Sequence, residues 1–331
     1  MPRCKLQGCP VAIDGRCLEN LGGECPNLLS DDGVAVDLPP SVDSEEVRIP
    51  TSAFEPLSPA VPLEVAQARR YSQRGLARVI SFVGMRECGK TSLLARIHQL
   101  FQSGPIGDFA FAGSASLPRL EEMNWLAAVQ SGLGQPQMDR SSSRFDNAFL
   151  HLEVLLRTSS VRIDMLFNDI SGETFERAVS SQSICDNLIV LRRANHVVVL
   201  IDGALMATHQ RHHHLAQIHD FLQRAIQGGH LHSHTIVHVV TSKMDCLPPN
   251  RLSTIDDAES ALRNRLEPVV NAVYTWRIAA RPMDGTLPTE LPIVDMFTHW
   301  ASSAIASPPA IMLPPLRQGR PICRFGFMNL P

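Results

Sequence analysis

The stretch Gly84–Thr91 reads GMRECGKT and decides the fold. It matches the pattern G-x-x-x-x-G-K-[ST], in which glycines let consecutive backbone N–H groups converge on phosphate oxygens. An apolar run, Val79–Val83, precedes it, and Thr91–Gln102 follows with apolar residues at helical spacing. A strand, a glycine-rich loop and a helix in this order predict a P-loop, with the phosphates at the positive end of the helix.

Two side chains of this loop have specific expected roles. Lys90 should reach the β- and γ-phosphates of a nucleotide, and the Thr91 hydroxyl should bind Mg²⁺. Arg86 could stabilise the transition state as an arginine finger in cis, or it could point to solvent. The loop residues expected to contact the nucleotide are Gly84, Arg86, Glu87, Cys88, Gly89, Lys90, Thr91 and Ser92.

Strand and helix patterns alternate along the chain after the loop. Strands are predicted at Phe109–Phe111, Ala148–Arg157, Val161–Phe167, Val197–Ile201, Thr235–Val240 and Ala272–Ile278. Helices are predicted at 64–77, Leu117–Val129, Asn187–Arg193, Gln210–Gln227, Asp256–Val270 and Pro292–Ala304. Such alternation predicts an α/β fold, a largely parallel sheet with helices on both faces, interrupted by one antiparallel hairpin (148–157 with 161–168).

A second polar motif, Asn168–Glu173 (NDISGE), ends the second strand of that hairpin. Asp169 stands where a carboxylate can hold Mg²⁺, directly or through water. Gly172 can offer an unhindered N–H to a γ-phosphate. Glu173 stands where a side chain could position the attacking water, although a solvated glutamate at a helix start fits the pattern equally well.

A third motif, Thr241–Asp245 (TSKMD), follows the strand at 235–240. The Asp245 carboxylate could accept both the N1–H and the N2–H₂ of guanine, a match that adenine does not offer. The stem of Lys243 could lie along the base. In the stretch Ile278–Arg281, the small Ala280 would let a backbone N–H approach the base O6.

The order of these motifs resembles that of a Ras-like P-loop GTPase over roughly residues 78–303. The resemblance implies a mixed sheet of about six strands with one antiparallel strand, and a DxxG segment that senses the γ-phosphate. The chain is most similar to the second GTPase of bacterial double-GTPase conflict systems, through DISGE at Asp169–Glu173, FAGS at Phe111–Ser114, the T-S-K-x-D motif and a cysteine-rich start. This resemblance implies a Mg²⁺-dependent switch that binds GTP and hydrolyses it to GDP, with a second GTPase and a GTPase-activating-like protein as partners.

Three departures from the Ras-like pattern bear on activity. Ser242 replaces the usual asparagine, and a hydroxyl is not expected to reproduce the amide contacts that brace the neighbouring loop. Glu173 replaces the usual glutamine, and its carboxylate would repel the γ-phosphate and slow hydrolysis. No switch-I threonine is evident; the positional candidates are Ser141–Ser143, Ser114 and Ser116. A non-hydrolysing, nucleotide-dependent interaction module and an ATP-using P-loop enzyme therefore remain as alternatives.

The N-terminus holds a separate cysteine cluster. Cys4, Cys9, Cys17 and Cys25 suit a closed tetrahedral Zn²⁺ site, which would explain how a segment with so little core folds. Free thiols are the alternative, because the usual C-x2-C knuckle is absent. The predicted organisation is a Cys-rich module at 1–30, an acidic, proline-rich linker at 31–77, a GTPase domain at 78–304 and a proline-rich tail at 305–331.

Composition limits the remaining classes of function. The 331 residues are 44% hydrophobic and carry a net charge of −3, which argues against a general nucleic-acid binder. No apolar run is long enough for a transmembrane helix, and the N-terminus lacks the apolar region of a secretory signal, so a cytoplasmic protein is expected.

Two other residue groups invite functional readings. His209 and His213 have the i, i+4 spacing of metal ligands on a helix, although a solvated helix face is the favoured interpretation. Trp125, Trp276 and Trp300 are expected in the core rather than as a base-stacking platform.

Overall fold

The structure is a computed structural model, and it describes residues 3–4, 28–29, 61–74, 76–127, 146–281 and 290–303. The chain divides into two units, Met1–Leu57 and Ser58–Pro331. In the first, β1 (Arg3–Cys4) pairs antiparallel with β2 (Leu28–Leu29). The predicted tail at 305–331 and most of the predicted linker lie outside the described residues.

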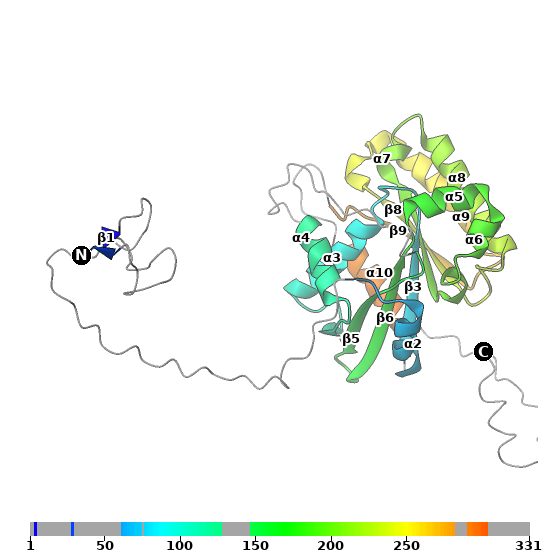
Figure 1. The fold of residues 1–331 in the computed structure, drawn as a ribbon. Helices are drawn as coiled ribbons and strands as arrows, with labels where there is room; N and C mark the ends of the chain where they lie inside the picture. The colour runs from blue at the N-terminus through cyan, green and yellow to red at the C-terminus, as the bar shows by residue number, and fades with distance from the viewer. Residues whose placement is uncertain are drawn as a thin grey trace, which may run out of the picture. The chain divides into compact units, whose positions relative to one another are not determined.

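The second unit is built on a mixed sheet (Figure 1), in the order β4-β5-β6-β3-β7-β8-β9. These strands are β4 (Phe109–Gly113), β5 (Leu150–Leu156), β6 (Val161–Asp169), β3 (Leu76–Val83), β7 (His196–Asp202), β8 (Ile236–Ser242) and β9 (Ala272–Arg277). Among them β5 alone runs in the direction opposite to the other strands. The sheet has seven strands in the described residues, where the resemblance implies about six, because β4, predicted at Phe109–Phe111, pairs along the outer edge of β5.

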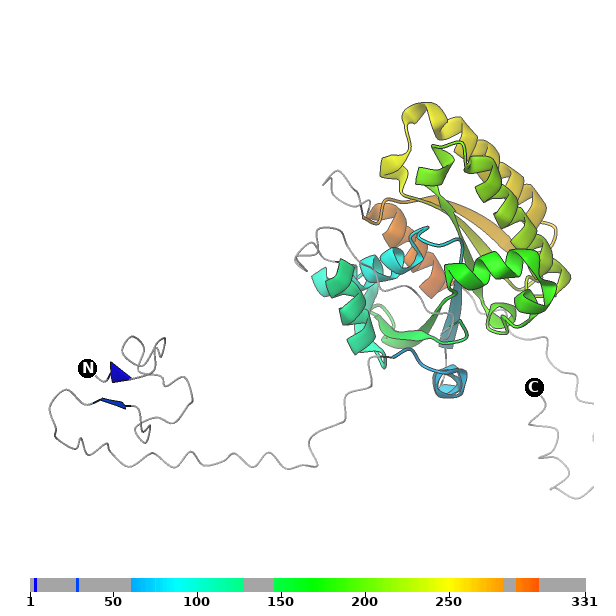
Figure 2. The same ribbon diagram turned by 45° about the horizontal axis from the view of Figure 1, so that its top comes forward.

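Helices cover both faces of this sheet, as Figures 1 and 2 show. One face carries α3 (Lys90–Ser103) and α10 (Leu291–Ser302), with α4 (Leu117–Ala127) packed on α3. The other carries α2 (Val65–Arg74), α5 (Gly172–Ser180), α6 (Gln182–Asp186), α8 (Arg211–Gln227) and α9 (Leu252–Leu266). In β7, Val198 and Leu200 face the first layer, while Val197 and Val199 face the second, as the alternation of a doubly covered strand requires.

The domain begins earlier than predicted, because part of the predicted linker packs on the sheet. Leu63 and Phe149 exchange two backbone hydrogen bonds, of 2.7 and 2.8 Å. Ala68 is buried, and the Tyr71 ring stacks on His151 with 4.0 Å between ring centroids. The polar, arginine-rich outer face of α2 hides these contacts in the sequence.

Most predicted elements are present, with three differences. The segment Asn187–Arg193, predicted as a helix, contains only a 3₁₀ turn at Leu191–Arg193, and α5 and α6, which precede it, were not predicted. Trp125 is 58% exposed, because α4 packs through Leu120 and Met123. The remaining short elements are α7 (Gly203–Met206) and 3₁₀ turns at Met244–Cys246 and Pro249–Arg251. No helix in the described part of the chain combines the length and apolar character needed to cross a bilayer.

Candidate functional site

The polar motifs meet at one edge of the sheet. The strands β6, β3, β7, β8 and β9 are parallel, so their carboxyl ends lie together. The P-loop follows β3, Asp169 ends β6, Asp202 ends β7, and Ser242 ends β8. In open α/β sheets, ligands bind beyond the carboxyl ends of the strands. The fold therefore brings the sequence motifs together at one site.

The P-loop backbone curls around the Lys90 ammonium group. Lys90 Nζ donates to the carbonyl oxygens of Gly84 and Met85, each at 2.9 Å. Gly89 and Glu87 adopt positive φ angles of 95° and 60°, which orient successive peptide groups inside the loop. Burial raises the pKa of the Cys88 thiol, so this loop cysteine stays protonated at neutral pH. Ser92 lies half-buried in the first turn of α3.

The two candidate Mg²⁺ ligands touch each other. The Thr91 hydroxyl donates to Asp169 Oδ2 at 2.9 Å, across a sequence separation of 78 residues. A hydroxyl and a carboxylate are the hard oxygen donors that Mg²⁺ prefers. The donor set present therefore fits the ion implied by the motifs.

The DxxG segment lies directly against the P-loop. A Cβ on Gly172 would lie 2.4 Å from the Arg86 backbone nitrogen, so only glycine permits this approach. Arg86 forms ion pairs with Glu173 at 3.2 Å and with Glu176 at 3.4 Å. The side chains of Arg86 and Glu173 are about half exposed, at 50% and 49%. Arg86 and Glu173, two of the three candidate catalytic side chains, are therefore paired with each other at the mouth of the site.

Ser242 braces the P-loop, contrary to expectation. Its hydroxyl lies 2.7 Å from the Cys88 carbonyl oxygen and 3.2 Å from that of Ile201. The side chain is buried, because β8 ends directly beneath the loop. At this distance the Ser242 hydroxyl can donate to the Cys88 carbonyl oxygen directly, so the longer side chain of the usual asparagine is not needed to brace the loop.

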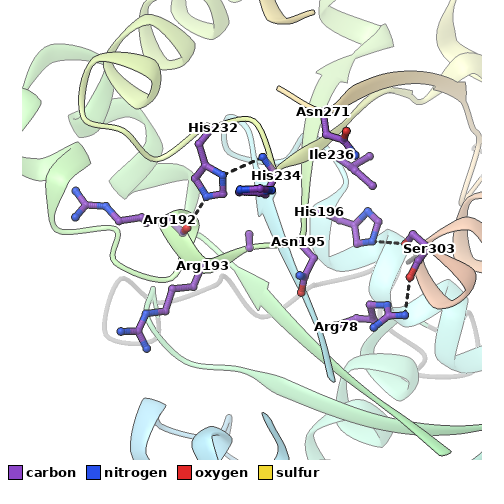
Figure 3. Close-up of a pocket in the computed structure, with 11 residues that line it drawn as sticks. Arg78, Arg192, Arg193, Asn195, His196, His232, His234, Ile236, Asn271 and Ser303 are labelled. Atoms are coloured by element: carbon purple, nitrogen blue, oxygen red, sulfur yellow. Dashed lines mark hydrogen bonds between the residues drawn. The ribbon is translucent and has the colours of Figure 1, made fainter. Parts of the chain in front are cut away.

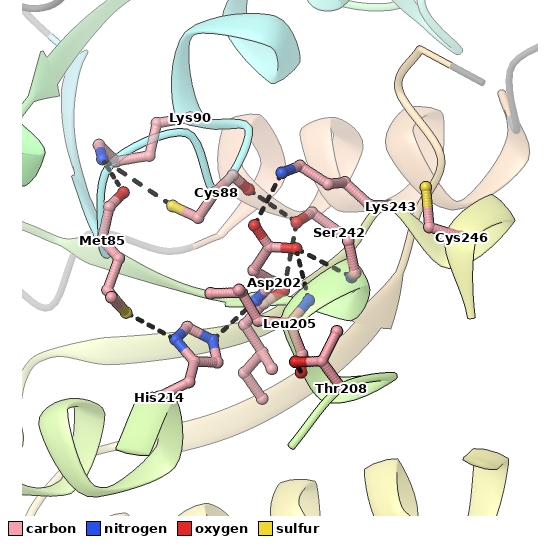
Figure 4. A network of polar contacts seen from close by, with 12 residues as sticks. Met85, Cys88, Lys90, Asp202, Leu205, Thr208, His214, Ser242, Lys243 and Cys246 are labelled. Atoms are coloured by element: carbon pink, nitrogen blue, oxygen red, sulfur yellow. Dashed lines mark hydrogen bonds and ion pairs between the residues drawn. The ribbon is translucent and has the colours of Figure 1, made fainter. Parts of the chain in front are cut away.

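Asp202 is a site residue that the motif search missed (Figure 4). Its Oδ2 pairs with Lys243 Nζ at 2.7 Å, while its Oδ1 accepts from the backbone nitrogens of Ala204 and Leu205 and caps α7. The Asp202 backbone N–H donates to His214 Nε2 at 2.9 Å. The signal was a carboxylate directly after the buried run Val197–Ile201, the same position that identified Asp169.

The two segments predicted to hold the base are joined by backbone hydrogen bonds. Met244 N donates to the Ile278 carbonyl at 3.2 Å, and Ile278 N donates to that of Thr241 at 2.9 Å. Asp245 is exposed in the 3₁₀ turn after β8, and Ala280 is half-buried beyond β9. Lys243 adopts a left-handed backbone conformation, with φ 51°, between the end of β8 and the 3₁₀ turn that contains Asp245.

The match to a known family follows this geometry. The family model described as Double-GTPase 2 matches residues 78–301, more than half of the chain. The chain belongs to the Double-GTPase 2 family. No curated protein matches the sequence. The match supports a GTPase-type domain on this P-loop fold, and it begins at Arg78 on β3.

The serines considered for switch I in this Double-GTPase 2 domain separate into two groups. Ser114 and Ser116 bind the main chain of His151 on β5, and Ser116 Oγ accepts from the His151 N–H at 2.7 Å. These contacts engage them with β5 rather than with a metal. The others, Ser141–Ser143, lie outside the described residues.

Asp146, which no sequence motif includes, lies against the DxxG motif. Its buried carboxylate accepts from the Ser171 N–H at 2.8 Å and from the Thr174 hydroxyl. Asn168 Nδ2 donates to its carbonyl oxygen at 2.7 Å. The chain at Asp146 is therefore tied to the first turn of α5, beside Gly172.

Three histidines of the Double-GTPase 2 domain cluster away from the nucleotide motifs. His196, His238 and His299 place ring nitrogens within 4.8 Å of one another. Trp276 Nε1 can only donate, and it donates to His238 Nδ1 at 3.0 Å, so His238 Nε2 must carry the proton that bridges to His196 Nδ1 at 3.0 Å. His196 Nε2 then donates to Ser303 Oγ at 2.8 Å. Because His238 has no lone pair left for a metal, this cluster is a chain of neutral hydrogen bonds.

The remaining candidate metal ligands are less well described. Cys4 lies on β1, whereas Cys9, Cys17 and Cys25 lie outside the described residues. On the histidine-rich segment, His209 precedes α8 and His213 is exposed, but His214 is buried against the P-loop residue Met85. The face predicted to be solvated is therefore only partly so.

Proposed function

We propose that the chain is a Mg²⁺-dependent switch that binds GTP and hydrolyses it to GDP, as a component of a bacterial conflict system. The observation that carries the proposal is the hydrogen bond between Thr91 and Asp169, 2.9 Å long and next to Lys90. It joins the P-loop to the DxxG strand with the oxygen donors that a nucleotide-bound Mg²⁺ requires. Mg²⁺, when bound, would neutralise charge on the β- and γ-phosphates.

The protein groups then position and stabilise the reacting phosphate. Lys90 would leave the carbonyls of Gly84 and Met85 to meet phosphate oxygens, and the Gly172 N–H would meet the γ-phosphate. Water would attack in line, with the transition-state charge spread over the positive groups of the loop. For Glu173 to orient that water, or for Arg86 to reach the phosphate, their ion pair has to open.

Guanine selection would depend on the other half of the site. Asp245 would accept from the base N1–H and N2–H₂, and Ala280 would present a backbone N–H to O6. Lys243, held by Asp202 at 2.7 Å, would lie along the base. The Ser242 contact with Cys88 supports this reading, because it couples base motif and P-loop as a guanine site requires.

Single-turnover GTP hydrolysis by the full chain tests the proposal. Lys90→Ala should slow turnover about a thousand-fold, because it removes a principal charge at the transferred phosphate. Lys5→Ala is the matched control, since it removes a lysine outside the domain and should leave the rate unchanged. Equal rates in Lys90→Ala and wild type would refute the assignment of Lys90.

A non-hydrolysing interaction module is the second candidate, and the Arg86–Glu173 ion pair favours it. Arg86 Nη2 and Glu173 Oε1 lie 3.2 Å apart, so neither side chain is available to act on the γ-phosphate while the pair is closed. In that case the wild-type chain would bind GTP tightly and leave it intact over a full single-turnover time course. Detectable release of phosphate that depends on Lys90 would exclude this candidate.

The proposal extends to partners and to the N-terminal cysteines. A second GTPase and a GTPase-activating-like protein would act on the switch in the cytoplasm, and Cys4, Cys9, Cys17 and Cys25 would hold one Zn²⁺. Pairing of Cys4 with Leu28 supports a closed module, because it brings the chain at Cys4 beside the end of the cysteine segment. Metal analysis of the purified chain should find one zinc per molecule; no bound zinc would leave free thiols.

A further inference from the structure

A buried guanidinium lies at the end of the sheet opposite the P-loop. Arg78 is on β3, and only 5% of it is exposed. Its Nη2 donates to the Ser303 carbonyl oxygen at 2.5 Å, but Nε and Nη1 are buried with no hydrogen-bond partner. A buried charge without a counter-charge is costly, and proteins rarely retain one.

A cavity of about 140 Å³ adjoins this guanidinium. Figure 3 shows Arg78 and Asn195 on neighbouring segments near Ser303, with Arg192 and Arg193 extending outward. No acidic side chain is among the described residues that line the cavity. Its charge is therefore positive, from one buried arginine and two exposed ones at the mouth.

Two neutral side chains of the cavity wall, His196 and Asn195, have hydrogen bonds that fix their donors and acceptors. The chain of hydrogen bonds from Trp276 keeps His196 uncharged and directs its Nε2 proton to Ser303. Burial lowers the pKa of His196 to about 3, in agreement with a neutral ring. Asn195 Oδ1 accepts from the Val79 N–H at 2.8 Å, which leaves its amide protons as further donors. Among the described residues that line it, the wall thus offers donors and positive charge and no carboxylate.

We propose that this cavity binds a small oxyanion, a phosphate or a carboxylate, that compensates Arg78. Guanidinium groups match both anions, since planar N–H donors meet paired oxygens. Arg192 and Arg193 attract the anion to the mouth, and the bound anion holds the end of α10 against β3 and β7. The site is separate from the nucleotide site, because it lies at the amino ends of the strands.

Thermal unfolding of the full chain tests this site, with GDP and Mg²⁺ present to occupy the P-loop. Inorganic phosphate and acetate are titrated separately, at constant ionic strength set with sodium chloride. The wild-type Tm should rise saturably with at least one of the two anions, and the effective anion identifies the ligand class. A Tm that neither anion raises above the chloride control overturns the proposal.

Two variants locate the effect. Lys90→Ala should keep the anion-dependent rise, which separates it from phosphate binding in the P-loop. Arg78→Met should lose the rise, and without anion it should melt no lower than wild type, because an uncompensated charge is gone. An unchanged rise in Arg78→Met would overturn the proposal.

A milder variant keeps the test decisive if Arg78→Met fails to fold. Arg193→Gln removes only an exposed charge at the mouth, and it should shift the anion midpoint several-fold to higher concentration. Arg70→Gln, an exposed arginine on α2, is the matched control and should not shift it. Identical midpoints in these two variants would contradict a role for the mouth arginines in capturing the anion.

Discussion

The two ends of strand β3 differ in how they treat positive charge. At the carboxyl end, Lys90 donates to two loop carbonyls and Lys243 pairs with Asp202 at 2.7 Å. At the amino end, Arg78 has one carbonyl partner and two unpartnered N–H groups. The cations at the carboxyl end therefore have internal partners that they can exchange for a ligand, whereas Arg78 has a charge that only a ligand could balance.

The largest expected effect is a loss of GTP binding at the carboxyl end of the strands. Asp245→Asn should weaken GTP binding about a thousand-fold, since a site built to pair a base edge rejects a mismatched one strongly. Binding of xanthosine triphosphate should improve, because an amide complements its altered edge.

Asp257→Asn, an exposed position on α9, is the control and should bind GTP like wild type. An Asp245→Asn chain that keeps GTP affinity, or that binds ATP in its place, would instead support the ATP-using alternative.

The next effect, of about 3 kcal/mol, is the pH dependence that His214 gives to the unfolding free energy. Burial lowers the folded-state pKa of His196 to about 3 and of His214 to about 4, below the ordinary value of 6.5. The unfolded chain therefore binds protons first as pH falls, so stability is full above pH 6.5 and declines toward pH 4. Each histidine should contribute a slope of about 1.4 kcal/mol per pH unit to the unfolding free energy.

Urea unfolding between pH 7 and 4 measures that slope. His214→Gln should reduce it by about one histidine's share, while His212→Gln, at an exposed position, should not. The same slope in wild type and His214→Gln would mean that His214 takes up its proton without unfolding.

Ser242→Ala should lower the unfolding free energy by about 2 kcal/mol. The Cys88 carbonyl oxygen, the nearer of the two acceptors, would lose its hydroxyl donor in a buried place. Ser183→Ala on α6 is exposed and serves as the control in urea unfolding. A loss no greater than that of Ser183→Ala would show that the brace adds nothing to the carboxyl end.

The smallest effect belongs to the exposed pair at the mouth of the site. Arg86→Ala should change the unfolding free energy by less than about 1 kcal/mol, since half-exposed ion pairs contribute little. If Arg86 acts on the phosphate, the Arg86→Ala variant should lose far more of its GTP hydrolysis rate than of its unfolding free energy. Equal rates in Arg86→Ala and wild type would assign the arginine to the ion pair alone.

Much of the fold could be predicted because local pattern and tertiary context agree. The apolar run Val197–Ile201 is buried on both faces, as β7 requires, and the GMRECGKT loop sits between β3 and α3. The helix predicted at 64–77 is present as α2, but it was assigned to the linker, because only Ala68 and Tyr71 among its residues make the contacts described above. β4 was predicted at Phe109–Phe111, and it exceeds the strand count that the resemblance implies because it adds an edge strand beside β5.

The residues at the two ends of β3 also differ in how well the sequence predicts them. The carboxyl-end residues follow strands in a fixed order, so motifs reveal them, and Asp202 could have been found by that rule. Ser242 could not be judged from its type, because its 2.7 Å contact depends on where β8 stops. Arg78 and Ser303 are 225 residues apart, and neither belongs to a motif.

The guanine site can be tested by titration calorimetry of the full chain with GDP and, separately, ADP in Mg²⁺. We expect a clear preference for GDP, because Asp245 recognises guanine and Ser242 holds the base motif against the P-loop. Equal affinities, or a preference for ADP, would leave the P-loop in place but contradict the guanine site at the carboxyl ends of the strands.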